Sequence, residues 1–261
     1  MKGNRSVVLE SDVKKAWKND EFEIFLQPQI NAENQNIEGF EALIRWAHPV
    51  HGILEPSEFL PIIRGIQMIE RLDFLVFEKV CAFLHKRHEE NKKLFCISCN
   101  FEREHFIKSN FVETLEKIRK RYRISAEYLA IEILEGKSFE EEKMVQANVA
   151  ELNSLQYQVC LDDCGAADSV MSDLLFHSIT HIKIDKKIVD HIERKNVQVL
   201  LQGLCGIAHR LSYRVVCEGV ETKRQLELAK KCGVDSIQGF YFFKPMDTDR
   251  AEILYDRYTG I

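Results

Sequence analysis

Residues 22–46, FEIFLQPQINAENQNIEGFEALIRW, contain two apolar stretches that have the length of β-strands, 22–30 and 38–46. Only residues 31–37 join them, and this link is too short for the helix that a connection between parallel strands needs. The two strands are therefore expected to pair in antiparallel fashion. This constraint limits how the rest of the chain can be arranged around them.

The chain after residue 46 alternates between short apolar stretches and longer amphipathic ones. Such alternation is typical of a parallel sheet whose strands are joined by right-handed helical connections. Several apolar stretches are rich in Val, Ile and aromatic residues, as strands covered on both faces are. Further strands are expected at 93–100, 128–134, 158–163, 181–185, 214–220 and 236–242, and the main helices at 102–122, 138–156, 188–211 and 222–232.

Eight strands of this kind predict an α/β fold, a TIM-like (β/α)8 barrel in which the first strand runs antiparallel to the rest. The length of 261 residues and the hydrophobic content of 45% suit one large core. No change in composition marks a linker, so a loose N-terminal tail at 1–6 and a single barrel domain at 7–261 are expected. A short helix at 11–19, capped by Ser11, is expected to lead into the barrel.

Charge and hydropathy exclude several classes of protein. The longest uninterrupted apolar run, Val80 to Leu84, is far shorter than the roughly 18 residues that span a bilayer, so no membrane insertion is expected. The N-terminus lacks the apolar segment of a secretory signal, which favours a cytoplasmic location. A formal net charge of −5 argues against binding to duplex nucleic acid, and the 8 cysteines are expected to be free thiols.

Acidic and amide side chains end most of the expected strands. In a barrel of this class the strand ends and the loops that follow them form the functional face, so these side chains are expected to converge. Carboxylates that converge repel one another and lose hydration unless a cation neutralises them. The polar residues at these positions are Glu41, Asn100, Glu132, Asp162, Asp163, Lys183, Asp185, Glu218, Glu221 and Gln238.

This oxygen-rich set predicts a site for hard divalent cations. Carboxylates with an Asn carbonyl, and no histidine among them, favour Mg²⁺ or Mn²⁺ over Zn²⁺. The adjacent pair Asp162 and Asp163 lies where strand alternation gives way to a loop, and it could serve two ions at once. Two ions a few ångströms apart are the usual arrangement for attack on a phosphodiester by metal-bound water.

Eight short motifs follow one another along the chain. The central one is Glu41-Ala42-Leu43 within EGFEALIRWAHPVHG. The others are QPQI at 27–30, ISCNF at 97–101, IEILE at 131–135, DDCG at 162–165, IKID at 182–185, CEGVET at 217–222 and QGFYFFKP at 238–245. In these motifs and in their order the chain resembles the EAL-domain phosphodiesterases that hydrolyse cyclic di-GMP. A lone E-A-L tripeptide would indicate little, whereas the matching blocks extend over nearly the whole chain.

The resemblance implies a metal-dependent hydrolysis of cyclic di-GMP to linear pGpG by a metal-bound water, with two Mg²⁺ or Mn²⁺ ions as cofactors. It also implies a homodimer, and sensor or cyclase domains in a longer parent chain. The implied metal ligands are Glu41, Asn100, Glu132, Asp162, Asp163 and Glu218. The implied catalytic residues are Lys183 and Glu218, the substrate-binding residues are Gln27, Arg45, Asp185 and Gln238, and the loop-stabilising residue is Glu135.

The loop after the fifth expected strand departs from the family pattern. Family members typically have D-D-F-G-T-G here, whereas residues 162–167 are DDCGAA. The changes remove a hydroxyl and a glycine, which can supply a local hydrogen bond and access to positive φ. A second interpretation therefore stays open: a catalytically weak or inactive EAL domain that acts as a cyclic di-GMP receptor or as a protein-interaction module.

Simpler roles are also open for individual residues. Asp185 could be a plain helix cap, and Lys183 could extend its aliphatic stem along a strand and keep its charge in solvent. His48 and His51 could suggest a metal site, but the family has a similar turn, so no ligand role is expected for them.

Overall fold

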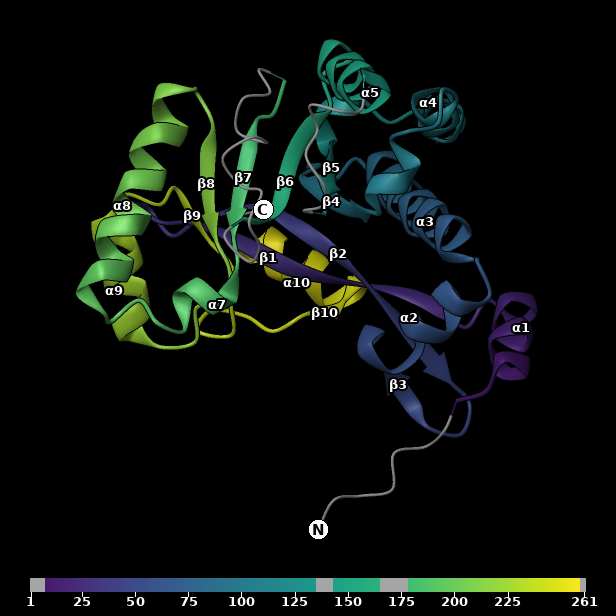
Figure 1. Cartoon of the computed structure of the whole chain (residues 1–261). Coiled ribbons are helices and arrows are strands. Elements are labelled where there is room, and N and C mark those ends of the chain that lie inside the picture. The colour runs from purple at the N-terminus through teal and green to yellow at the C-terminus, as the bar shows by residue number, and fades with distance from the viewer. Residues whose placement is uncertain (1–7, 135–142, 165–177, 259–261) are drawn as a thin grey trace.

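The computed structural model of the protein describes residues 8–134, 143–164 and 178–258. Its centre is a closed β-barrel with helices packed around the outside (Figure 1). The ring runs β1-β9-β8-β7-β6-β5-β4-β2 and is closed by pairing between β1 and β2. Its strands are β1 (Phe22–Asn31), β2 (Ile37–His48), β4 (Cys96–Phe101), β5 (Leu129–Ile133), β6 (Gln158–Cys164), β7 (His181–Ile184), β8 (Arg214–Cys217) and β9 (Ser236–Ile237).

The first strand runs against the others, as its short link to the second strand predicts. β1 pairs antiparallel with both β2 and β9, whereas the other neighbouring pairs of the ring are parallel. Asn31 forms the turn between β1 and β2, because its Oδ1 accepts the backbone N–H groups of Glu33 and Asn34. The predicted barrel with one reversed strand is confirmed. Two short strands lie outside the ring, β3 (Gly52–Leu54) on β2 and β10 (Met246–Asp247) on β1.

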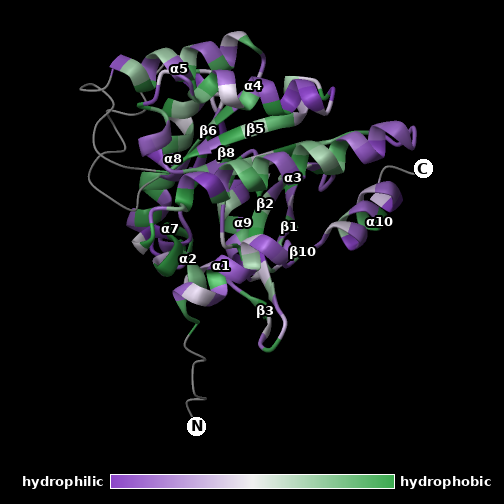
Figure 2. Cartoon of the chain, turned by 90° about the vertical axis from the view of Figure 1, so that its right-hand side faces the viewer, coloured by the Kyte–Doolittle hydropathy of each residue, from purple (hydrophilic) through white to green (hydrophobic). Residues whose placement is uncertain are grey.

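Helices cover the outer face of the ring and bury its apolar side chains. Figure 2 shows apolar residues concentrated on the central strands and hydrophilic residues on the outer turns of the helices. In the described part of the chain, no helix is long and apolar enough to cross a membrane. The helices are α1 (Glu10–Asn19), α2 (Pro56–Gly65), α3 (Ile69–Glu89), α4 (Phe111–Arg121), α5 (Lys143–Ser154), α7 (Lys186–Val189), α8 (Lys195–Arg210), α9 (Lys223–Cys232) and α10 (Thr248–Tyr258), with 3₁₀ turns η1 (Arg103–His105) and η2 (Ala126–Tyr128).

Several predicted boundaries are wrong in detail. The stretch 102–122 forms η1 and α4 rather than one helix, and 188–211 contains the end of α7 and then α8. Ser11 does not cap α1, because that helix begins at Glu10 and Leu9 occupies the cap position. The last two barrel strands end earlier than predicted, since the chain turns there into the loops of the functional face. The predicted tail at 1–6 lies outside the described residues.

Arg87 attaches the C-terminal helix to the barrel wall. Its guanidinium group is fully buried and lies 2.8 Å from a carboxylate oxygen of Glu252 and 2.8 Å from one of Asp256, both on α10. The same group donates to the carbonyl oxygen of Lys93 at 2.9 Å and lies 4.9 Å from the ring centre of Phe95. A buried charge is tolerated only when its donors are paired, so α10 and Arg87 depend on one another.

Replacing Arg87 with Met is expected to lower the free energy of unfolding by about 3 kcal/mol, because removing one member of a buried ion pair leaves the others without compensation. Urea unfolding measures this loss. Arg121→Met is the matched control, since Arg121 pairs with Glu78 at 2.7 Å on the exposed surface, where a pair is worth about 1 kcal/mol or less. Equal losses in the two variants would contradict this role of Arg87.

Candidate active site

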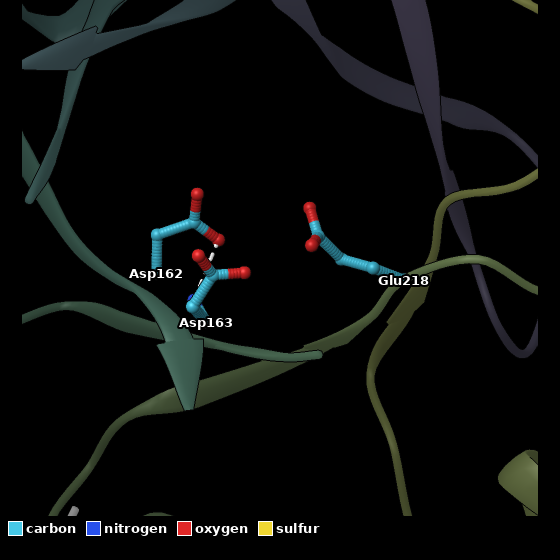
Figure 3. Close-up of side chains that lie close together, drawn as sticks. All are labelled: Asp162, Asp163 and Glu218. Carbon is cyan, nitrogen blue, oxygen red and sulfur yellow. Dashed lines mark hydrogen bonds between the residues drawn. The ribbon is translucent and has the colours of Figure 1, made fainter. Parts of the chain in front are cut away.

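Asp162 and Asp163 both reach the mouth of the barrel because β6 ends in a bulge. The register between β6 and β7 shifts between Leu161 and Cys164. Asp163 has φ 56°, in the left-handed region that Asp tolerates better than most residues. Its backbone N–H donates to Asp162 Oδ1 at 2.9 Å. The bulge interrupts the alternation of the strand, so two neighbours in sequence face one site (Figure 3).

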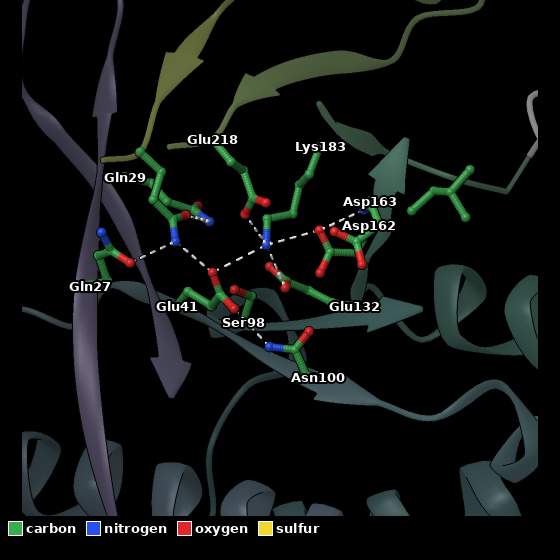
Figure 4. Close-up of polar contacts among 12 residues, drawn as sticks. Gln27, Gln29, Glu41, Ser98, Asn100, Glu132, Asp162, Asp163, Lys183 and Glu218 are labelled. Atoms are coloured by element: carbon green, nitrogen blue, oxygen red, sulfur yellow. Dashed lines mark hydrogen bonds and ion pairs between the residues drawn. The ribbon is translucent and has the colours of Figure 1, made fainter. Parts of the chain in front are cut away.

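The ammonium group of Lys183 lies among four carboxylates (Figure 4). Its Nζ is 2.6 Å from Glu218 Oε1 and 2.7 Å from Glu132 Oε2. It is also 3.2 Å from Glu41 Oε2 and 3.3 Å from Asp162 Oδ1. The Lys183 side chain is fully buried, so the interpretation in which it carries its charge to solvent is wrong. The carboxylates come from β2, β5, β6 and the residue after β8.

Glu41 is the best-supported carboxylate of the cluster. Asn100 Nδ2 donates to its Oε1 at 2.7 Å, and Gln238 Nε2 donates to its Oε2 at 2.5 Å. Burial alone would raise the pKa of Glu41, but Lys183 and these two amide donors outweigh it and hold the pKa below its ordinary value. Glu41 is therefore ionised at neutral pH.

The other carboxylates have raised pKa values. Burial, and then repulsion by Glu41, raises the pKa of Glu132 to about 8. Burial also raises the pKa of Glu218 well above its ordinary range. Burial together with the charge of Asp162 raises the pKa of Asp163 to about 6. The cluster thus contains more negative charge than one ammonium group balances, and it retains protons unless further cations bind.

This donor set fits divalent cations. Oxygen atoms of Asp162, Asp163 and Glu218 lie within 4.8 Å of one another, so a single ion could contact all three (Figure 3). Glu132 Oε1 is buried and has no hydrogen-bond partner among the residues that the structure describes. A buried carboxylate oxygen without a partner is costly, and a hard cation is a ligand that would satisfy it.

A pocket of ≈ 320 Å³ opens at this end of the barrel. Five of its lining residues belong to the acidic cluster or to the amide side chains beside it, and others include Lys186, Glu221 and the half-exposed Phe240. Lys186 Nζ lies 3.0 Å from Glu221 Oε1. The loops that form the pocket are closely packed, because a Cβ atom at Gly239 would overlap the backbone of Val220. The pocket therefore combines acidic groups with a cation and an aromatic ring.

The structure brings most of the sequence-predicted site residues to this mouth, although their roles stay predictions. Arg45 is buried, and within the described ranges it has no carboxylate at ion-pair distance; its guanidinium lies 5.6 Å from the ring of Phe25. Glu135, like residues 165–167 of the departing loop, lies outside the described residues. The residues that meet at the mouth are Gln27, Glu41, Asn100, Glu132, Asp162, Asp163, Lys183, Glu218 and Gln238.

Two of the simpler interpretations agree with the local geometry. Asp185 caps α7, because its Oδ1 accepts the backbone N–H of Lys187 at 2.6 Å. His48 Nδ1 accepts the backbone N–H groups of Val50 and His51, which is a turn contact. In the described part of the chain, the acidic group that could hold a metal does not include these histidines.

Sequence analysis missed one polar residue of the site, Gln29. Its Nε2 donates to Gln238 Oε1 at 3.1 Å (Figure 4). Gln29 lies two positions after Gln27 on β1, so the two side chains share one face of the strand. The spacing of two residues between Gln27 and Gln29 is the feature of the sequence that could have indicated Gln29 as a site residue.

A closed barrel with a buried acidic cluster at the carboxyl ends of its parallel strands defines a TIM-like barrel protein with its candidate site at that face. Comparison with known proteins then gives the family: the family model described as EAL domain matches residues 10–245. The chain belongs to the EAL domain family.

Curated relatives agree with this assignment. The chain is 32% identical over 244 residues to the oxygen sensor protein DosP of Escherichia coli (strain K12), a match that covers 93% of this chain and 30% of DosP. It is 28% identical over 244 residues to the probable cyclic di-GMP phosphodiesterase PdeG of the same organism, which covers 93% of this chain and 48% of PdeG. The chain thus spans about a third to a half of the length of these relatives.

Solved structures agree on the fold. The EAL enzyme Bd1971, in its cAMP- and cyclic-di-GMP-bound form, has a TM-score of 0.86 and 27% sequence identity to this chain. The match covers 94% of this chain and 68% of that one. The barrel and the family that the sequence motifs predict are both confirmed.

The raised pKa values predict how the metal-free protein responds to pH. A carboxyl group whose pKa is higher in the folded than in the unfolded chain binds more protons when folded, so its contribution to stability is fully present at low pH. The contribution is lost as the pH rises from about 4.3, the ordinary pKa of Glu, to the pKa of about 8 of Glu132. We expect the free energy of unfolding, measured in urea, to fall across this window.

Glu132→Gln should flatten this pH dependence, because the variant lacks the proton-binding group. Glu127→Gln is the control, since Glu127 is exposed on the outside of the barrel. Added Mn²⁺ should stabilise the protein more at the upper end of the window, because ligands must lose their protons to bind a metal. Stability of the metal-free protein that rises from pH 5 to pH 8 would contradict the proposed charge state.

Proposed function

We propose that this chain is a metal-dependent phosphodiesterase that hydrolyses cyclic di-GMP to linear pGpG. The observation that carries the proposal is the cluster of five carboxylates at the barrel mouth, four of which surround one buried lysine. The family supports the choice of substrate, since relatives include proteins named as cyclic di-GMP phosphodiesterases. The EAL enzyme Bd1971, whose structure is similar to that of this chain, was solved with cyclic di-GMP bound.

Two Mg²⁺ or Mn²⁺ ions are the proposed cofactors. When bound, they would act as Lewis acids that lower the pKa of water and polarise the phosphate. The close approach of three carboxylates supports one of the two positions. The ligands proposed for the first ion are Glu41, Asn100, Glu132 and Asp162, and those for the second are Asp162, Asp163 and Glu218.

The chain's own residues would carry the remaining steps. Lys183 is proposed to hold the attacking water and to stabilise the negative charge that develops on the phosphate oxygens. Glu218 is proposed to accept the proton of that water, a role supported by the raised pKa that burial gives it. Arg45 is proposed to bind a phosphate, because it is a buried cation without a carboxylate partner in the described part of the chain.

Three further residues are proposed to shape the substrate site. Gln27 and Gln238 line the pocket beside the acidic cluster. Asp185 would act indirectly, since its charge, after burial and Asp162, contributes to the raised pKa of Asp163.

The alternative is a receptor or protein-interaction module with little turnover. The sequence DDCGAA at 162–167 favours it, because residues 164, 166 and 167 differ from the family pattern. The proposed ligand set argues for the enzyme, since all six residues are present and lie at one mouth. A homodimer, a cytoplasmic location and additional sensor or cyclase domains stay predictions that rest on the family resemblance and the sequence.

Incubation with cyclic di-GMP and Mn²⁺, followed by chromatography, is expected to yield pGpG, and a chelator should stop the reaction. Glu41→Gln should lower kcat by about 100-fold or more, because it removes a charged ligand at the reacting centre. The fold should be retained, as circular dichroism would report. Glu221→Gln is the control from the same pocket, and it should keep most of the activity because Glu221 is half exposed and pairs with Lys186.

Formation of pGpG, or binding without it, separates the two functions. Undiminished turnover in Glu41→Gln would remove Glu41 from the site. Tight binding of cyclic di-GMP by the wild-type chain without any pGpG would favour the receptor. Absence of both binding and turnover would overturn the phosphodiesterase and the cyclic di-GMP receptor alike.

A further inference from the structure

Three glutamine side chains form a continuous set of hydrogen bonds beside Glu41 (Figure 4). Gln27 Nε2 donates to the backbone carbonyl oxygen of Phe243 at 3.2 Å. Gln238 Nε2 lies 3.3 Å from Gln27 Oε1 and 2.5 Å from Glu41 Oε2. Gln29 Nε2 donates to Gln238 Oε1 at 3.1 Å. The set links the reversed strand β1 to the end of β9 and to β2.

Two fixed acceptors determine the direction of all three amides. A backbone carbonyl can only accept, so Gln27 must turn its NH₂ group to Phe243 and its oxygen to Gln238. An ionised carboxylate also only accepts, so Gln238 must turn its NH₂ group to Glu41. The oxygen of Gln238 then faces Gln29, and only the NH₂ group of Gln29 can bond to it.

Burial makes this last hydrogen bond important. Gln238 is 4% exposed and Glu41 is 5% exposed, so solvent has little access to either. Within the described residues, Gln29 is the donor that reaches Gln238 Oε1. A buried carbonyl oxygen without a donor is destabilising, because it loses its hydrogen bonds to water and gains none in the protein. An amide that rotated to avoid this cost would turn its oxygen toward the carboxylate of Glu41.

The oxygen of Gln29 is the other end of the set. Gln29 is half-buried and lines a chamber of ≈ 110 Å³ inside the barrel, together with small or polar residues such as Ser98, Ala130 and Gln158. In the described part of the chain, no protein group donates to Gln29 Oε1. A polar chamber of this size has room for on the order of three water molecules, and these can donate to that oxygen.

We propose that Gln29 is a positioning residue for Glu41 and acts through Gln238. It fixes the polarity of the Gln238 amide, so that Glu41 receives a donor instead of facing an acceptor. The expected effect on metal binding rests on the proposed role of Glu41 as a metal ligand. The orientation of the Gln238 amide does not depend on that role. Groups that orient a metal ligand typically change the affinity for the metal by about 10- to 100-fold.

Gln29→Met removes the donor and keeps the length of the side chain. The matched control is Gln158→Met, which removes an amide from the same chamber at a residue without a hydrogen bond to Gln238. Calorimetric titration with Mn²⁺ should show about tenfold weaker binding for Gln29→Met. Gln158→Met should bind Mn²⁺ within about twofold of the wild type, because it leaves the hydrogen bonds that orient Glu41 intact.

A nuclear magnetic resonance readout tests the polarity directly. The side-chain NH₂ resonance of Gln238, assigned by its loss in Gln238→Met, should show slow exchange with water in the wild type and faster exchange in Gln29→Met. Gln29→Glu is the second variant and has nearly the same volume. Its ionised carboxylate only accepts, so at pH 8.5 it should weaken Mn²⁺ binding despite its added negative charge.

The outcomes are distinguishable from those of the proposed function. A wild-type chain that fails to bind Mn²⁺ would overturn the proposed metal site, while the Gln238 resonance would still report on Gln29. An unchanged Gln238 resonance in Gln29→Met would overturn the positioning role. Equal losses of Mn²⁺ affinity in Gln29→Met and Gln158→Met would also overturn the positioning role. Such a result would mean that any change in the polarity of the chamber lowers the affinity.

Discussion

The mouth of this barrel depends on a buried ammonium group shared by four carboxylates. Taking ions out of water is costly, and the cost is offset only when opposite charges meet at short distance with their remaining atoms bonded. Lys183 meets Glu218 and Glu132 at 2.6 and 2.7 Å, but Glu132 keeps one oxygen without a partner in the described structure. Lys183 therefore compensates only part of the negative charge of the cluster. An excess of negative charge of this kind is what a cation-binding site needs.

The reversed first strand makes this arrangement possible. β1 lies between β2 and β9, antiparallel to both, and joins the side of the ring that holds Glu41 to the side that holds Gln238. Gln27 is paired in register with Glu41 across β1 and β2. The amides of β1 thus contact Gln238, which donates to the Glu41 carboxylate, from a strand that contributes no acidic residue to the cluster. The topology adds an indirect polar support for Glu41 through Gln238.

Local sequence patterns predicted the parts of the fold that local physics determines. The short link at 31–37 was sufficient to predict the antiparallel pair, and apolar stretches ending in acids predicted the strands and the face where they end. The bulge at Asp163 was beyond prediction, because positive φ at a non-glycine residue is imposed by packing with β7. Gln29 was missed for a similar reason: its partner, Gln238, is 209 positions away.

The unusual loop sequence begins where the proposed ligand set ends. The six proposed ligands lie on strands or at their ends, within the described residues, and the changes in the loop at 162–167 begin at Cys164. Cys164 itself is buried and pairs in register with Ile184 on β7, so its thiol contributes to the core and lies outside the ligand set. Substitutions there leave the charge balance around Lys183 unchanged.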